Sequence, residues 1–164
     1  MKQAKVYSII QGFSKIEQNR CRKYINSPYF NQNKPLSELF ELIVGQVNTG
    51  KYQEWTKEDV WNAIVEDQPF DDTRMRKYFS DLLKLVEGFL AQEVFQEDPI
   101  NEAIYLISAI GRRKIEKLHN SVSRRARQLS EKAPFRSTNY YLNQYLIERN
   151  YYEMSEFEEK RTVK

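Results

Sequence analysis

The sequence predicts an all-α protein of about eight helices, arranged as antiparallel helical hairpins. Three observations support this fold class. Apolar residues recur with the helical period from one end of the chain to the other. The 164 residues include only 5 glycines and 5 prolines, the two residue types that most often interrupt helices. No stretch alternates apolar and polar residues convincingly in the manner of a β-strand.

The first two helices are predicted over residues 3–12 and 14–26. Ser14 stands three positions before Glu17, which is the spacing of a capping box. In that motif the serine hydroxyl and the glutamate carboxylate each accept a hydrogen bond from a backbone N–H that the first turn leaves unpaired. The second helix should end near residue 26, because Pro28 disfavours helical geometry at the residue before it.

A corner with the sequence INSPYFNQNKPL joins the second and third helices. Pro35 has no N–H and is tolerated only in a first helical turn, so the cap of the third helix is placed at Asn33 or Lys34. The loop is then short. We expect Tyr29 and Phe30 to tuck under the corner as packing residues, in preference to forming a ligand-binding loop.

The next three boundaries also carry recognisable signals. Gly50 is a plausible end for the third helix, and Thr56 with Asp59 repeats the capping-box spacing before the fourth. The longest helix of this half is predicted over residues 72–96. Gly88 lies inside that helix, where glycine costs about 1 kcal/mol relative to alanine. We interpret it as a point of close contact with another helix.

The C-terminal part is predicted to contain three more helices, over residues 99–111, 113–132 and 138–154. They are of similar length and have short connections, as in stacked antiparallel pairs. We therefore predict two domains. Residues 1–97 form an N-terminal helical bundle, and residues 98–164 form a stacked helix pair or the start of a helical-repeat, solenoid-like array.

Two segments of the N-terminal half share features with a known family. Residues 27–31 read Ser-Pro-Tyr-Phe-Asn after a helix, and residues 80–90 fit the pattern Ser-x-Leu-x-x-Leu-x-Glu-x-Phe-Leu. They resemble the N-terminal region of an uncharacterised family of large bacterial all-helical proteins. The resemblance covers about the first hundred residues. It implies that relatives continue into further helical hairpins, and it implies no activity.

Composition narrows the cellular setting. The net charge is only +3, which is mild for a nucleic-acid-binding protein, although a local basic patch is compatible with it. A single cysteine, Cys21, favours a reducing compartment. No signal peptide is recognisable, and no apolar run approaches the roughly 18 residues that a membrane span requires. We expect a soluble cytoplasmic protein without membrane contact.

Residues of the kinds that catalysis and metal binding require are scarce, so we predict that the protein is not an enzyme. His119 is the only histidine and lies beside an apolar helical stripe, where we expect it to be a packed residue. One cysteine and one histidine do not make a zinc site. The five glycines stand apart and form no phosphate-binding loop. We expect no cofactor and no bound metal.

The predicted seventh helix carries the strongest local charge. Between residues 112 and 132 there are eight basic residues and two acidic ones. On a helical wheel a ridge lies opposite the apolar stripe. Its members, the candidate nucleic-acid contacts, are Arg113, Lys117, Arg124 and Arg127. Such a ridge can follow phosphates, although the outer face of an amphipathic helix is polar in any case. We rank a solvated or protein-contacting face above nucleic-acid binding.

The last helix has apolar residues on two sides. One broad face holds Tyr141, Leu142, Tyr145, Leu146 and Tyr152. The nearly opposite face holds the candidate protein contacts Tyr140, Ile147, Tyr151 and Met154. Packing on one neighbour covers one face only, so we expect this second face to be open and to bind a second copy, a partner protein or further helices. The leading hypothesis is a non-enzymatic helical scaffold that binds another protein. The alternative is a helical nucleic-acid-binding module that uses the basic ridge.

Overall fold

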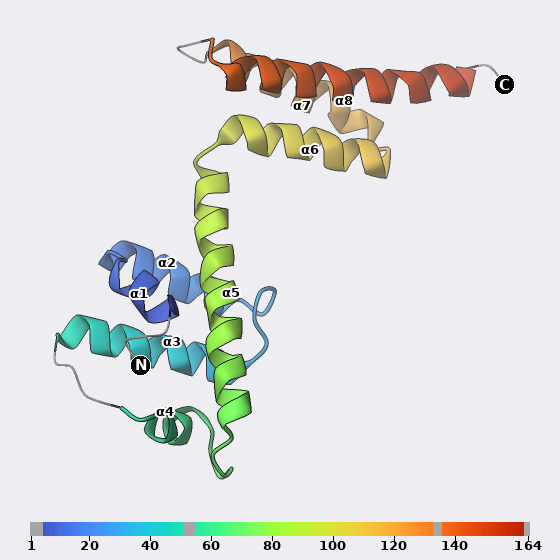
Figure 1. Cartoon of the computed structure of the whole chain (residues 1–164). Coiled ribbons are helices and arrows are strands. Elements are labelled where there is room, and N and C mark those ends of the chain that lie inside the picture. The colour runs from blue at the N-terminus through green and yellow to red at the C-terminus, as the bar shows by residue number, and fades with distance from the viewer. Residues whose placement is uncertain (1–4, 51–54, 133–135, 163–164) are drawn as a thin grey trace. The chain divides into compact units, whose positions relative to one another are not determined.

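The computed structural model of the chain describes residues 5–50, 55–132 and 136–162, with only the backbone described for Glu116 and residues 154–162 (Figure 1). This described part contains eight α-helices and no strand, which confirms the predicted fold class. None of its helices combines the length and the apolar character needed to cross a membrane. The helices are α1 (Lys5–Gln11), α2 (Lys15–Ile25), α3 (Lys34–Thr49), α4 (Lys57–Ile64), α5 (Asp72–Gln96), α6 (Pro99–Arg113), α7 (Glu116–Glu131) and α8 (Thr138–Thr162).

The chain forms two compact units, Met1–Gln92 and Glu93–Lys164, which are called unit 1 and unit 2 below. The boundary expected from the sequence follows residue 97, at the end of α5. The compact units divide instead within the last turns of that helix. One reason is that Phe95 packs against Tyr105 of α6, with 5.8 Å between ring centroids. The end of α5 therefore contributes to unit 2.

The helix starts of unit 1 have the predicted caps. In α2 the Ser14 N–H donates to the Glu17 carboxylate at 2.7 Å, and the Glu17 N–H donates to the Ser14 hydroxyl at 3.2 Å. Hydrogen bonds from the Ser14 hydroxyl and then from its backbone N–H hold the pKa of Glu17 below its ordinary value. Thr56 and Asp59 form the same reciprocal pair at the start of α4. Gly50 ends α3 in the left-handed conformation, with φ of 59°.

The core of unit 1 is built from the apolar faces of its five helices. Trp61 of α4 is fully buried, packs against Phe70 and Tyr78, and donates its indole N–H to the Gln68 carbonyl at 3.0 Å. The other large side chains at its centre are Ile10, Ile25, Leu39, Phe40, Ile43, Met75 and Leu82. Cys21 is also fully buried in this cluster. α5 supplies buried residues along most of its length, from Met75 to Phe89.

Gly88 marks a close approach between α2 and α5, as the sequence indicated. A Cβ atom at this position would lie 2.8 Å from the Tyr24 hydroxyl oxygen, which is closer than side chains ordinarily pack. The ring of Tyr24 also packs against Phe89, with 6.0 Å between centroids. The glycine therefore leaves room for a ring that lies on the helix.

The prediction that both corner aromatics are tucked in is wrong for Tyr29 and only partly right for Phe30. Tyr29 is 87% exposed, and Phe30 is 42% exposed. The ring of Tyr24 already fills the space against α5, so Phe30 stacks on its outer side, with 4.0 Å between centroids. Asn31 secures the corner from within by donating from Nδ2 to the Ile25 carbonyl at 3.1 Å. The corner is held by polar bonds, by the Tyr24–Phe30 stack and by an edge-to-face contact of Tyr29 with Phe30 at 4.9 Å between centroids.

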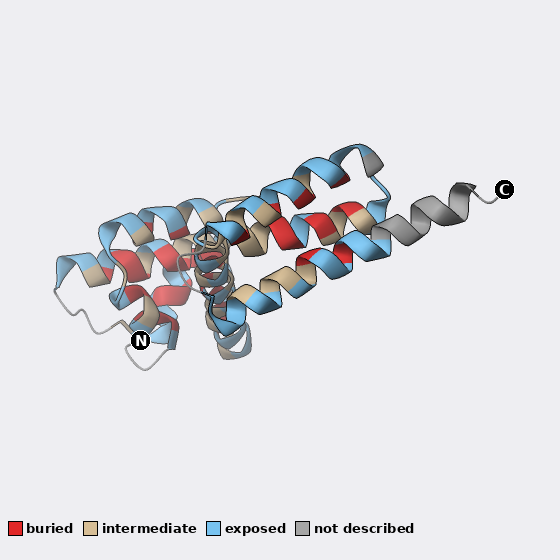
Figure 2. Ribbon diagram, turned by 90° about the horizontal axis from the view of Figure 1, so that it is seen from above, coloured by how far each residue is buried: buried red, intermediate tan, exposed pale blue. Residues whose placement is uncertain are grey.

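Apart from the end of α5, unit 2 consists of α6, α7 and α8, which all pack against one another. Asp98 caps α6 by accepting from the Asn101 N–H at 3.1 Å. α6 ends at Arg113, because Lys114 takes the left-handed conformation with φ of 55°. This turn reverses the chain, and α7 begins at Glu116, later than the predicted residue 113. In Figure 2 the buried residues of the three helices face the space that the helices share.

The stacked position of Phe30 generates a first prediction. Phe30→Ala should cost about 1–2 kcal/mol in the free energy of unfolding, because the Tyr24 ring loses its partner and some apolar burial. Tyr29→Ala, the matched variant next to it, should stay within about 0.5 kcal/mol, the range of ordinary surface substitutions. Urea unfolding followed by circular dichroism measures both. Equal losses in the two variants would show that the stack contributes nothing of its own.

Candidate interaction surface

The rotation of α8 about its axis decides which of its two apolar faces is available. Ile147 is 0% exposed and lies in a core cluster formed by α6, α7 and α8. The other members of this cluster are Ala103, Ile104, Ile107 and Ala126, with Ile100, Val122, Leu129 and Leu146 packed against it. The expectation that Ile147 lies on an open face is therefore wrong. Because α8 packs against both α6 and α7, its most apolar side chain lies between those two helices.

Two other members of the expected contact face are partly covered. Tyr140 is half-buried at the start of α8. Tyr151 remains partly exposed, but its ring is engaged by α7. The side chain of Met154 lies outside the described residues. The three of these side chains that the structure describes do not form an open patch on α8.

Polar contacts between α7 and α8 fix the same rotation. Arg127 makes a two-point ion pair with Glu148, at 3.0 Å from Nε to Oε1 and 3.2 Å from Nη2 to Oε2. Its guanidinium also lies over the ring of Tyr151, 4.9 Å from the centroid. Both contacts are partly exposed, so each is worth about 1 kcal/mol or less. Together they form an orienting clamp along one edge of the α7–α8 contact.

His119 is a packed residue, as its position beside the apolar stripe predicted. It is buried, and its imidazole stacks on Tyr151 with 5.5 Å between ring centroids. Its Nε2 finds no hydrogen-bond partner among the described residues, and neither does the Ser123 hydroxyl one turn further along α7. Both belong to the interior of unit 2 and present no group to its surface.

Once Ile147 points inward, the opposite face of α8 must point outward. Tyr141, Leu142, Tyr145 and Tyr152 are all well exposed there, Tyr145 to 59%. We call these four residues the tyrosine row. At the rise of an α-helix the row runs for roughly 16 Å. Both apolar faces of α8 were predicted from the sequence, but the prediction took the buried face for the open one.

The basic ridge predicted for the seventh helix is divided. Arg113 belongs to α6, where it donates to the Ala109 carbonyl at 3.1 Å. Arg127 is engaged with α8 through the clamp. Lys117 and Arg124 remain exposed, and Arg125 lies beside them. None of these three forms an ion pair with a described side chain. A basic patch of three residues therefore remains where a ridge of four was expected.

Comparisons with family models, with curated proteins and with solved structures found no match for this chain. The resemblance of the N-terminal half to a family of large helical proteins stays a prediction. Functional inference therefore rests on the surfaces of the molecule itself. Two of them follow directly from the packing of unit 2, namely the tyrosine row on α8 and the basic patch on α7.

The clamp generates a second prediction. Arg127→Gln should lower the free energy of unfolding by about 1–2 kcal/mol, because it removes the two-point ion pair and the contact with the Tyr151 ring. Arg124→Gln removes the same charge from the exposed side of α7 and should change stability by no more than about 0.5 kcal/mol. Thermal unfolding at low and high salt measures both. If the two variants behave alike, the clamp does not orient α8.

Proposed function

We propose that this protein is a non-enzymatic helical interaction module that binds another protein through the tyrosine row of α8. One observation carries the proposal. Four large side chains, three of them tyrosines, are exposed along one face of a helix whose opposite face is already buried. Tyrosine is enriched at protein interfaces because its ring buries apolar area while its hydroxyl keeps a polar contact.

The shape of the tyrosine row favours a helix as its occupant. Tyr141 and Tyr145 are one turn apart, and Tyr152 continues the line further along the axis. Such a line forms a ridge that fits the groove of a second helix. The charged residues beside it, Glu148 and Arg149, have opposite signs. They therefore would not repel a partner helix of either net charge. An amphipathic helix of another protein fits this description, and a second copy of α8 fits it too.

Self-association gives a direct test. Sedimentation velocity over a concentration series should show a monomer–dimer equilibrium that Tyr141→Glu/Tyr145→Glu weakens at least about tenfold, because buried tyrosines often dominate interface energies. The variant should stay folded, since both side chains are exposed. Ser121→Glu/Gln128→Glu adds the same two charges to the exposed side of α7 and should leave the equilibrium unchanged. A wild type that remains monomeric at millimolar concentration would contradict this use of the row.

A second candidate function rests on the basic patch. Lys117, Arg124 and Arg125 are exposed and have no ion-pair partner among the described side chains, so their charge is available to a polyanion such as a nucleic acid. Aromatic side chains for base stacking are not interleaved with the patch, so binding would be to the phosphate backbone. We rank this function second because Arg113 and Arg127 are otherwise engaged.

The salt dependence of DNA binding separates the two candidates. If the basic patch binds duplex DNA, the affinity for a random duplex should fall with salt with a logarithmic slope of about −0.9 per neutralised phosphate. Replacing Lys117, Arg124 and Arg125 by glutamate should then abolish binding, as measured by fluorescence anisotropy.

The control for this experiment is a triple reversal of exposed lysines in unit 1, at Lys15, Lys77 and Lys84. It changes the net charge by the same amount. Equal effects of the two reversals would show that only net charge matters, and would remove the basic patch as a site.

A further inference from the structure

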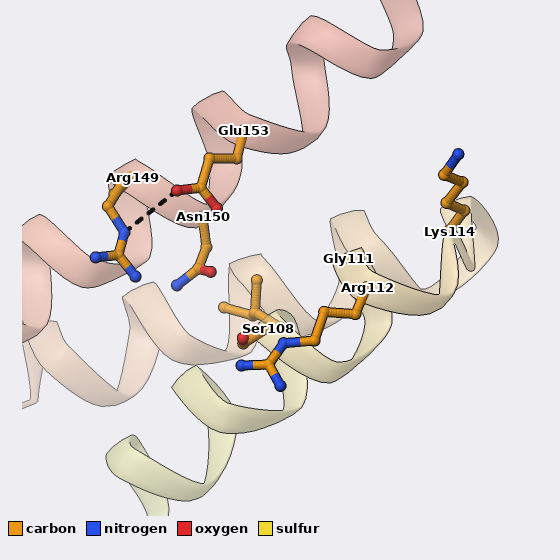
Figure 3. A pocket seen from close by; sticks show the side chains of 8 residues that line it. Ser108, Gly111, Arg112, Lys114, Arg149, Asn150 and Glu153 are labelled. Carbon is orange, nitrogen blue, oxygen red and sulfur yellow. Dashed lines mark ion pairs between the residues drawn. The ribbon is translucent and has the colours of Figure 1, made fainter.

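A pocket of about 330 Å³ lies in unit 2, between α6 and α8 (Figure 3). Ser108, Gly111 and Arg112 of α6 line one side, and Arg149 and Asn150 of α8 line another. Pockets that hold small molecules measure about 300–1,000 Å³, so this one lies at the small end of that range.

Positive charge dominates the lining. Arg112, Lys114 and Arg149 contribute three cationic groups, and Glu153 contributes one anionic group. Arg149 pairs with Glu153 at 3.5 Å from Nε to Oε1, which is long for an ion pair, and its guanidinium also lies 5.9 Å from the ring centroid of Tyr145. Neither contact uses the other N–H donors of the guanidinium, so these can bind a second anion. The C-terminal end of α6 adds about half a negative charge, which the cationic excess outweighs. The lining as a whole favours an anion.

Arg112 lies in the last turn of α6 but does not cap the helix. Its neighbour Arg113 donates to the Ala109 carbonyl, which is the ordinary role of a basic residue in a last helical turn. Arg112 makes no hydrogen bond or ion pair with any residue that the structure describes. Figure 3 shows its side chain running past Ser108 on the side of the pocket that faces α8. Its five N–H donors are therefore available to a ligand.

The polar groups around Arg112 point to the class of ligand. A planar guanidinium binds two oxygens of a phosphate at once, and the Ser108 hydroxyl adds a donor beside it. Asn150 is buried, and its Nδ2 is held by the Leu146 carbonyl at 2.7 Å, which fixes its amide at the pocket wall. Glu153 can accept a hydrogen bond from a hydroxyl of the ligand.

We propose that the pocket between α6 and α8 binds the phosphate group of a small phosphate monoester that also carries hydroxyl groups. The phosphate lies against Arg112 and Arg149, and the hydroxyl-bearing part lies against Asn150 and Glu153. The Arg149 guanidinium also lies 5.9 Å from the ring centroid of Tyr145 in the tyrosine row, but the site does not depend on the proposed protein contact. It needs only the packing of α6 on α8 that the buried core of unit 2 provides.

The experiment is a titration of the whole chain with glycerol 3-phosphate, followed by the NMR shifts of the Gly111 amide and the Asn150 side-chain amide. We expect saturable shifts of both signals. Arg112→Gln should weaken binding about tenfold or more, the usual loss for a hydrogen bond to a charged group. Arg113→Gln removes the same charge one residue away and should change the affinity by less than about twofold, since its guanidinium is engaged at Ala109.

Three results would overturn the proposal. The first is the absence of saturable shifts at 20 °C in low salt, with glycerol 3-phosphate raised to roughly 10 mM, a concentration at which even weak specific sites fill. The second is equal weakening by Arg112→Gln and Arg113→Gln, which would indicate diffuse attraction to a basic surface. The third is equal shifts with glycerol, which would show that the phosphate is not recognised. Circular dichroism checks that each variant keeps its helix content.

Discussion

The burial of Ile147 between α6 and α7 is the contact on which the surfaces of unit 2 depend. A helix has one rotational degree of freedom when it packs, and this side chain fixes it for α8. Tyr145 is then directed outward, Glu148 meets Arg127, and Asn150 reaches the pocket wall beside α6. A rotation of one residue, about 100°, would exchange all of these assignments. The burial of one apolar side chain therefore decides which residues α8 presents at the surface of unit 2.

The parts of the fold that could be predicted from the sequence are those decided by local chemistry. Three helix starts are capped by residues close in sequence, namely Ser14 with Glu17, Thr56 with Asp59, and Asp98. Because each cap pairs backbone N–H groups within a few residues, the spacing in the sequence is enough to predict the helix start. Lys114 is the opposite case. Nothing about a lysine announces a left-handed conformation, and it adopts one because α7 must fold back on α6. The start of α7 and the placement of Arg113 were misassigned for this reason.

The candidate sites required knowledge of which helices meet. Apolar residues on both sides of α8 were visible, but they balance so closely that only the positions of α6 and α7 select the buried side. The corner after α2 shows the same limit, because Tyr24 occupies the space in which Phe30 was expected. The pocket was not foreseen at all. Its residues come from two stretches of the chain, 107–114 and 149–153, and no local pattern joins Ser108 to Asn150.

The single cysteine has a practical consequence for a chain with two compact units. Cys21 is sealed inside unit 1, and unit 2 has none, so a thiol reagent reaches its target only when unit 1 opens. The rate of Cys21 alkylation therefore reports the opening of unit 1 alone. Set beside a whole-chain probe such as circular dichroism, it reveals whether the two halves melt as one cooperative body or in succession. If the two units unfold independently, a ligand that stabilises only unit 2 would leave the rate of Cys21 alkylation unchanged.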